Sequence, residues 1–234
     1  MAARRGKWWM LAALPVLAAA AGWLTVEREH DHAHEPLALL AQPIVLPPVQ
    51  LVDHRSRQVT EAVFAGGWTF ATLGFTFCPD VCPATLAQLA VVRQKVAEQH
   101  AGVALPRVVL ISVDPERDTP ARLASYVAAF DASFVGVTGA PAQVAALEES
   151  LTAFHRTGAH AHGEHYSVSH TGDIFLFDPA GRVVAKFEPA TEPAQVAQQF
   201  AVIADSFARA VAAGDDAPLH DHSSHRASPP GPRT

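Results

Sequence analysis

The sequence predicts an α/β domain, a central mixed β-sheet flanked by helices, behind one N-terminal transmembrane helix. From residue 44 to residue 213, short apolar runs typical of buried strands alternate with longer segments of helical period. Two further strand-like runs, joined by a Pro-Ala-Gly-Arg turn, come before a last long helical segment. About 170 residues are enough for one domain with a sizeable core. Because hairpins flank the strand-helix alternation, we expect one mixed sheet.

Each element is predicted from a local pattern. Residues 44–53 and 58–62 are expected to form one hairpin, and 174–178 with 183–187 another. Thr119 followed by Pro120 predicts a helix start, because threonine caps a first turn and proline has no N–H to lose there. The strand over 69–77 leads straight into the turn that carries both cysteines. The predicted strands are 44–53, 58–62, 69–77, 107–113, 134–138, 174–178 and 183–187, and the predicted helices are 83–99, a helix from Pro120, 141–154 and 192–211.

Residues 8–26 form an unbroken apolar run of about the length that crosses a bilayer. Three basic residues precede it, and because positive charge stays on the cytoplasmic side, residues 1–7 are expected inside the cell. The run is therefore predicted to be a single-pass anchor in the inner (cytoplasmic) membrane, with the following domain in the periplasm. The alternative is a cleaved signal peptide, since the run is Ala-rich and Pro15 weakens a helix.

Segments of biased composition flank the predicted domain, which spans 44–213. Residues 27–43 contain a His-rich patch and are predicted to be a flexible tether, and residues 214–234 are predicted to be a disordered tail that also contains histidines. The chain has 13 histidines, for which metal affinity is the simplest physical reason. A net charge of −6, with no basic stripe interleaved with aromatic residues, argues against a nucleic-acid partner.

The two cysteines of the chain, Cys78 and Cys82, lie in one turn between a strand and a helix. Their i, i+4 spacing places both sulfurs on one face if the turn is helical. Pro83 predicts that Cys82 lies near the N-cap, where the helix dipole stabilises thiolate and raises nucleophilicity and metal affinity. The pair is therefore predicted to be redox-active, metal-binding or both, and able to form a disulfide. A structural disulfide or two inert thiols are the alternatives, although so small a loop would stabilise the fold little.

Three segments resemble motifs of the SCO/SenC family of membrane-anchored copper chaperones. They are GFTFCPDVCP (74–83), ISVDPERDTP (111–120) and SHTGDIFLFDPAGRVV (169–184), and the similarity runs over about residues 44–211. The resemblance implies a thioredoxin-like fold and copper, as Cu(I) and/or Cu(II), bound by Cys78, Cys82 and His170. Two thiolates and one imidazole suit copper, whereas a structural zinc site usually has four protein ligands.

The same resemblance implies a function. It is that of a chaperone, and not of an enzyme in the usual sense, that delivers copper to the binuclear copper centre of cytochrome c oxidase. The implied partners are the copper-centre subunit of the oxidase and other periplasmic copper chaperones. One alternative is a periplasmic thiol-disulfide reductase that keeps client cysteines reduced through Cys78 and Cys82. Another is a copper or redox sensor, which would share every ligand.

Further residues near these motifs have weaker predicted roles. His160, His162 and His165 lie close in sequence to His170 and are predicted to form an auxiliary copper site. Asp80 and Asp114 are interpreted as turn and cap residues and not as contacts of the metal ligands. The aromatic ring of Phe77, immediately before Cys78, is expected to exclude water from the site or to be part of the core.

Overall fold

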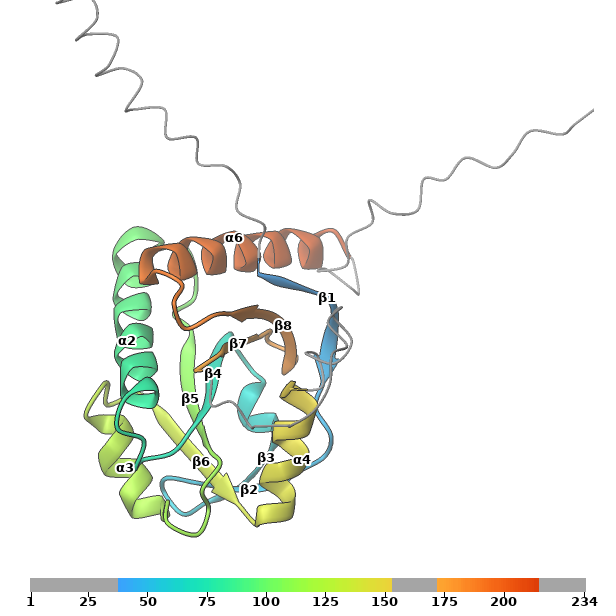
Figure 1. The fold of residues 1–234 in the computed structure, drawn as a ribbon. Helices are drawn as coiled ribbons and strands as arrows, with labels where there is room; N and C mark the ends of the chain where they lie inside the picture. The colour runs from blue at the N-terminus through green and yellow to red at the C-terminus, as the bar shows by residue number, and fades with distance from the viewer. Residues whose placement is uncertain (1–37, 153–171, 215–234) are drawn as a thin grey trace, which may run out of the picture. The chain divides into compact units, whose positions relative to one another are not determined.

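The computed structural model describes residues 38–152 and 172–214, in which one mixed sheet carries helices on both faces (Figure 1). The strand order is β1-β8-β7-β4-β5-β6-β2-β3. β4 pairs in parallel with β5, and β5 with β6, whereas the other neighbouring strands pair antiparallel. The prediction of a mixed sheet is thus confirmed. The strands are β1 (Leu39–Val45), β2 (Gln50–Asp53), β3 (Gln58–Thr60), β4 (Thr69–Gly74), β5 (Arg107–Ser112), β6 (Val135–Gly139), β7 (Ile174–Phe177) and β8 (Arg182–Phe187), and the helices are η1 (Glu61–Phe64), α2 (Val81–Gln99), α3 (Pro120–Ala128), α4 (Pro141–Thr152) and α6 (Pro193–Ala212).

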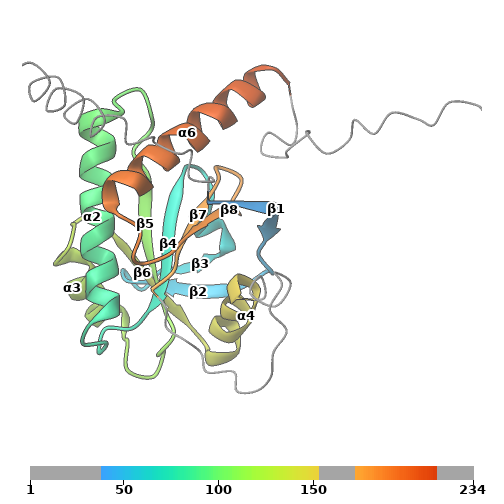
Figure 2. The ribbon, with the colours of Figure 1, turned by 45° about the horizontal axis from the view of Figure 1, so that its top comes forward.

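The central strands are apolar throughout because helices cover both of their faces. In β5, Val108 and Leu110 pack into a core with α2, α3 and α6, while Val109 and Ile111 pack into a second core with α4 and η1. Successive side chains of a strand point to opposite faces, so this division follows from the period of two. Figures 1 and 2 show α2 and α6 on one side of the sheet and α4 on the other.

Shortening Ile203 to valine should lower the free energy of unfolding by about 1 kcal/mol, because the lost methylene leaves a cavity in the core. Ile203 lies on α6 and is 1% exposed. Urea unfolding of the two proteins measures the difference. Val202→Ala is the control, since Val202 is 44% exposed on the same helix and its truncation should change stability by about 0.5 kcal/mol or less. Equal losses in both variants would contradict this orientation of α6.

The N-terminal strands differ from the prediction. Residues 44–53 do not form one strand, because Pro47 and Pro48 lack the N–H that a strand ladder requires. The chain instead forms β1, which pairs with β8, and β2, which pairs with β3 and β6. β1 begins at Leu39, before the predicted domain start at residue 44. The strand contains a proline, and its register with β8 shifts between Leu39 and Ile44, so the sequence shows no regular strand pattern there. β3 ends at Thr60, whose hydroxyl accepts the N–H of Ala62 and begins η1.

The other elements lie close to their predicted ranges. Thr119 caps α3 as predicted, because its Oγ1 accepts the N–H of Arg122 at 3.3 Å and Pro120 opens the helix. The hairpin of β7 and β8 is also confirmed. The predicted strand 69–77 is too long, since β4 ends at Gly74.

Several predicted segments lie outside the described residues: the anchor 8–26, most of the tether 27–43, and the tail from residue 215 on. None of the helices in the described ranges is both long and apolar enough to cross a membrane.

Candidate functional site

The two cysteines lie where β4 gives way to α2, at the carboxyl end of a central parallel strand. Cys78 is half-buried in the turn, Cys82 is 2% exposed in the first turn of α2, and both are free thiols. The helix begins at Val81 with Asp80 as N-cap, so the expectation that Pro83 opens the helix is wrong. Pro83 is tolerated as the third helical residue because the first N–H groups of a helix have no acceptor within it. Cys82 is therefore inside the helix and Cys78 before it.

The sulfur of Cys78 lies over the N-terminus of α2. The N–H of Cys82 donates to Cys78 Sγ at 3.4 Å. Burial alone would raise the pKa of Cys78, but the N–H groups of Asp80, Cys82 and Val81, with the Cys82 thiol, outweigh burial and leave this pKa below its ordinary value. Cys78 is thus the thiol that ionises more easily, as expected of a sulfur at a helix N-terminus.

The sulfur of Cys82 lies in the opposite environment. A Cβ at position 74 would be 3.0 Å from Cys82 Sγ and 3.1 Å from Leu110 Cδ1, so glycine at that position makes room for the buried thiol. Burial, followed by the hydrogen bond and charge of Cys78 and the charge of Asp118, raises the pKa of Cys82 to about 12. The same sulfurs and carboxylate, after burial, raise the pKa of Tyr126 to about 12. The Cys78 thiol therefore ionises readily, whereas the environment of Cys82 favours the neutral thiol.

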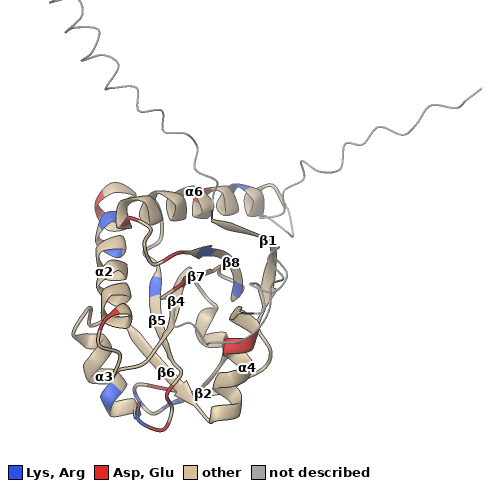
Figure 3. Cartoon of the chain, viewed as in Figure 1, with Lys and Arg blue, Asp and Glu red and all other residues tan. Residues whose placement is uncertain are grey.

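On the solvent-exposed side of the cysteine turn, the ring of Phe77 lies against the guanidinium groups of Arg117 and Arg122. Phe77 is 45% exposed, so it is not part of the core. The guanidinium of Arg122 lies 3.8 Å and that of Arg117 4.8 Å from the centre of its ring. Arg117 also forms an ion pair with Asp114, which fits the interpretation of Asp114 as a loop residue. Charged residues of both signs are spread over the described helices and loops (Figure 3).

A buried carboxylate that the sequence analysis did not select lies behind the turn. Asp118 is fully buried and accepts hydrogen bonds from Thr76 and Ser112. Its position in the ISVDPERDTP segment was a signal, but Asp114 and the Thr119 cap account for that pattern equally well. By contrast Asp80, the N-cap residue, is exposed and makes no side-chain cap hydrogen bond.

The structure does not place the predicted imidazole ligand. His170, with His160, His162 and His165, lies outside the described residues. Within the described ranges, no group of three or more His, Cys, Asp or Glu side chains is arranged to hold a metal ion.

Gly172, the first described residue after His170, packs against the opening turns of α2. It is buried with φ +68°, and a Cβ there would lie 2.6 Å from Val81 Cγ2 and 2.8 Å from Thr85 Oγ1. Thr85 is fixed in turn, since its hydroxyl donates to the carbonyl oxygen of Val81 at 2.9 Å. The chain that follows His170 therefore reaches the same helical turn that carries Cys82, and only glycine fits there.

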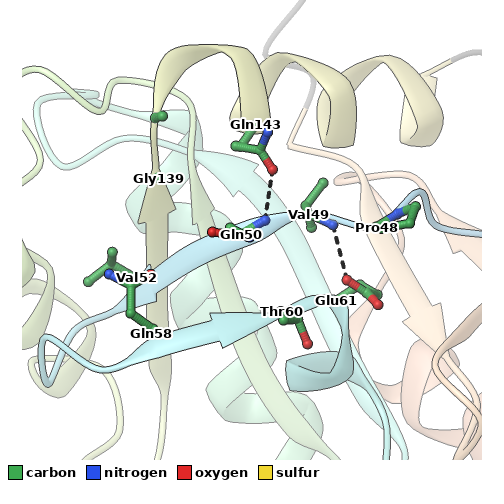
Figure 4. A pocket seen from close by; sticks show the side chains of 10 residues that line it. Pro48, Val49, Gln50, Val52, Gln58, Thr60, Glu61, Gly139 and Gln143 are labelled. Carbon is green, nitrogen blue, oxygen red and sulfur yellow. Dashed lines mark hydrogen bonds between the residues drawn. The ribbon is translucent and has the colours of Figure 1, made fainter.

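The hollow of about 700 Å³ between β2, β3, β6 and the start of α4 is a separate feature (Figure 4). Two polar side chains that line it are already hydrogen-bonded to the backbone. Gln143 accepts the N–H of Gln50 at 2.8 Å, and Glu61 accepts the N–H of Val49 at 3.0 Å. Neither cysteine lines it. The chemistry of the described chain is thus at the cysteine turn and not in this hollow.

Comparison with known proteins finds relatives over most of the described chain. The family model described as SCO1/SenC matches residues 39–205. The bovine protein named "Protein SCO2 homolog, mitochondrial" is 34% identical over 178 residues, covering 74% of this chain and 66% of its own length. Two solved structures with copper bound are also similar to this chain. Arabidopsis thaliana ScoI is 26% identical with a TM-score of 0.56, covering 68% of this chain and 96% of that chain. Bradyrhizobium japonicum ScoI is 32% identical with a TM-score of 0.51, covering 66% and 96%.

The similarity to the first curated relatives is partial. The matched segments span 66%, 60% and 51% of the length of the bovine, human and mouse SCO2 homologues. The segment that matches the family model, residues 39–205, includes every described strand and most of α6. The likeness to the two copper-bound structures extends over nearly their full length.

Proposed function

This chain belongs to the SCO1/SenC family, and on that premise we propose that it is a copper chaperone that binds copper through Cys78, Cys82 and His170. The two cysteines act as thiolates and His170 as a neutral imidazole. The copper is delivered to the binuclear copper centre of cytochrome c oxidase, and the copper-centre subunit of the oxidase is the client. Copper is the cargo here, since the protein holds it only until transfer.

The observation that carries the proposal is the convergence of chain segments at the first turn of α2. Cys78 and Cys82 enter it from the end of β4, and Gly172 packs on it from the start of β7. His170 is two residues before Gly172, so its Cα lies within about 7 Å of that of Gly172 even in a fully extended chain. A ligand role for His170 therefore needs no long reach.

The chemistry of these donors suits copper. Two sulfurs and one imidazole match the soft Cu(I) ion, and the imidazole also tolerates Cu(II). The unequal exposure of the sulfurs favours transfer by ligand exchange: a client thiolate approaches the copper beside Cys78 and replaces one donor at a time. Copper then passes between proteins without release into solution.

The surrounding segments complete the proposal. Residues 8–26 anchor the chain in the inner membrane and the domain works in the periplasm, because the positive residues before this run favour a cytoplasmic N-terminus. His160, His162 and His165 form a weaker auxiliary site that passes copper to the main one.

A second function, thiol-disulfide reduction, is favoured by the asymmetry of the thiols. In this reaction the Cys78 thiolate attacks a client disulfide and expels one client thiolate, which leaves a mixed disulfide. Cys82, on losing its proton, attacks Cys78 and releases the second client thiolate, and the two cysteines end as a disulfide. A periplasmic dithiol reductant must then restore the pair. This function needs no His170, which is the difference that an experiment can use.

A competition titration of the reduced full chain with Cu(I) tests the proposal. We expect one tightly bound equivalent in the wild type, its loss in Cys78→Ser and Cys82→Ser, and an affinity at least about tenfold lower in His170→Ala. His100→Ala is the matched control, since His100 lies at the other end of α2. Tight binding that His170→Ala leaves unchanged, or none in the wild type, would move the assignment to the reductase.

A further inference from the structure

Asp118 holds a fully buried carboxylate in the loop between β5 and α3. It accepts three hydrogen bonds: from Thr76 N–H at 3.0 Å, from Thr76 Oγ1 at 2.6 Å and from Ser112 Oγ at 2.6 Å. A buried charge is costly unless such donors replace water. So costly a group, placed beside a turn that has to hold thiolates, requires an explanation.

Each of the two hydroxyl groups that bind Asp118 also accepts a hydrogen bond from another part of the chain. Thr76 Oγ1 donates to Asp118 and accepts Arg122 Nε–H at 2.7 Å. Ser112 Oγ donates to Asp118 and accepts the N–H of Asp114 at 3.2 Å. The network thus joins the cysteine turn, the end of β5, the following loop and α3. Networks of this kind fix a geometry when every member is satisfied.

The hydrogen bonds reach the two cysteines through two successive peptide units, and Asp118 binds the second of them. The N–H of Thr76 donates to Asp118, and the carbonyl of the same peptide, that of Phe75, accepts the N–H of Cys78 at 3.2 Å. The N–H of Phe75 hydrogen-bonds to the sulfur of Cys82. Rotation of the Phe75–Thr76 peptide would therefore move Cys78 relative to Cys82, whose sulfur is bound by the preceding peptide.

We infer that Asp118 is the positioning residue of the thiol pair: its carboxylate fixes the Phe75–Thr76 peptide and thereby the placement of Cys78 relative to Cys82. The inference rests on the proposed function in so far as the pair binds copper. Only a carboxylate can accept from all three donors, because an amide at this position would turn its NH₂ group toward one of them.

Asp178 provides a matched control. It is also fully buried, accepts the N–H of Ala180 at 3.0 Å and that of Arg182 at 2.9 Å, and forms an ion pair with the guanidinium of Arg182, whose Nε–H lies at 2.8 Å. It closes the hairpin between β7 and β8. Since β7 runs antiparallel to β4 and Phe177 pairs with Thr69, this hairpin lies at the end of β4 opposite to the cysteines.

The test compares Asp118→Asn with Asp178→Asn in the full chain. Three quantities are measured: Cu(I) affinity by competition, the ratio of alkylation rates of Cys78 and Cys82 in the copper-free protein, and the thermal midpoint. Both variants should melt earlier than the wild type. Asp118→Asn alone should lower copper affinity about 10- to 100-fold, as loss of a group that orients metal ligands does, and should also bring the two alkylation rates closer together.

The readouts separate failure of this inference from failure of the proposed function. If the wild type binds no copper tightly, the proposed function fails, and the alkylation ratio of the copper-free proteins still decides the role of Asp118. If Asp118→Asn melts early but keeps the wild-type affinity and alkylation ratio, the carboxylate is only structural and the inference is overturned. Should Asp118→Asn not fold, Thr76→Val decides, because it removes the hydroxyl that binds Asp118 and Arg122 but keeps the N–H that donates to Asp118. Smaller shifts in the same direction support the inference, and wild-type values overturn it.

Discussion

Cys78 of the reduced, copper-free chain should react with iodoacetamide at least about 30 times faster than Cys82 near pH 8. The pKa of Cys78 is below the ordinary 9.0 and that of Cys82 is about 12, so their thiolate fractions differ by at least about 1000-fold at this pH. The more basic thiolate is the better nucleophile, which returns a factor of roughly 20 to 30. Burial of Cys82, 2% exposed, slows it further. Peptide mapping by mass spectrometry after timed quenching measures both rates.

The dependence of these rates on pH gives the control. A lowered pKa means that the Cys78 rate rises with pH and reaches half its maximum below about pH 9, whereas the Cys82 rate keeps rising toward pH 12. In Cys82→Ser the fast reaction should remain, and in Cys78→Ser only a slow one should be left. Equal rates for the two cysteines of the wild type would contradict the assignment of Cys78 as the ionising thiol.

Gly172→Ala should reduce Cu(I) affinity on the order of 100-fold, the upper end of what loss of ligand support costs. Its Cβ would lie 2.6 Å from Val81 Cγ2 and 2.8 Å from Thr85 Oγ1, so the segment after His170 has to move away from the first turn of α2. A Cu(I) competition titration, with circular dichroism to show that the fold is retained, measures the effect.

Gly66→Ala separates this clash from backbone strain. Gly66 has φ +85°, comparable to Gly172, but a Cβ there meets nothing within 4 Å. Both variants thus carry the cost of a left-handed conformation, roughly 1–2 kcal/mol, and only one displaces the site. The same copper affinity in both variants would show that the packing of Gly172 has no part in holding the ligand.

The parts of the fold that were predicted correctly are those with local causes. Thr119 and Pro120 define the start of α3 by capping chemistry alone, and β5 shows as an apolar run because both of its faces are buried. The separation of β1 from β2 could not be predicted in the same way. Although Pro47 and Pro48 indicate a break, the choice of β8 as the partner of β1 depends on pairing with residues far along the chain, such as Ala185.

The same distinction holds for the site. The spacing of Cys78 and Cys82 predicts that they share a turn, because i, i+4 neighbours depend only on local geometry. Their unequal environments depend on Leu110 and Asp118, which only the folded sheet brings beside them. Thr76 and Asp118 are 42 residues apart, so no window along the sequence contains both.

The two outer strands of the described sheet bear on how the protein behaves at high local concentration. β3 is only three residues long, Gln58–Thr60, and β1 carries Pro43 and a break in its register with β8. An edge strand recruits another chain when it offers a long, regular row of free N–H and C=O groups, and short or proline-containing edges do not. The sheet therefore resists strand-to-strand aggregation at both of its margins.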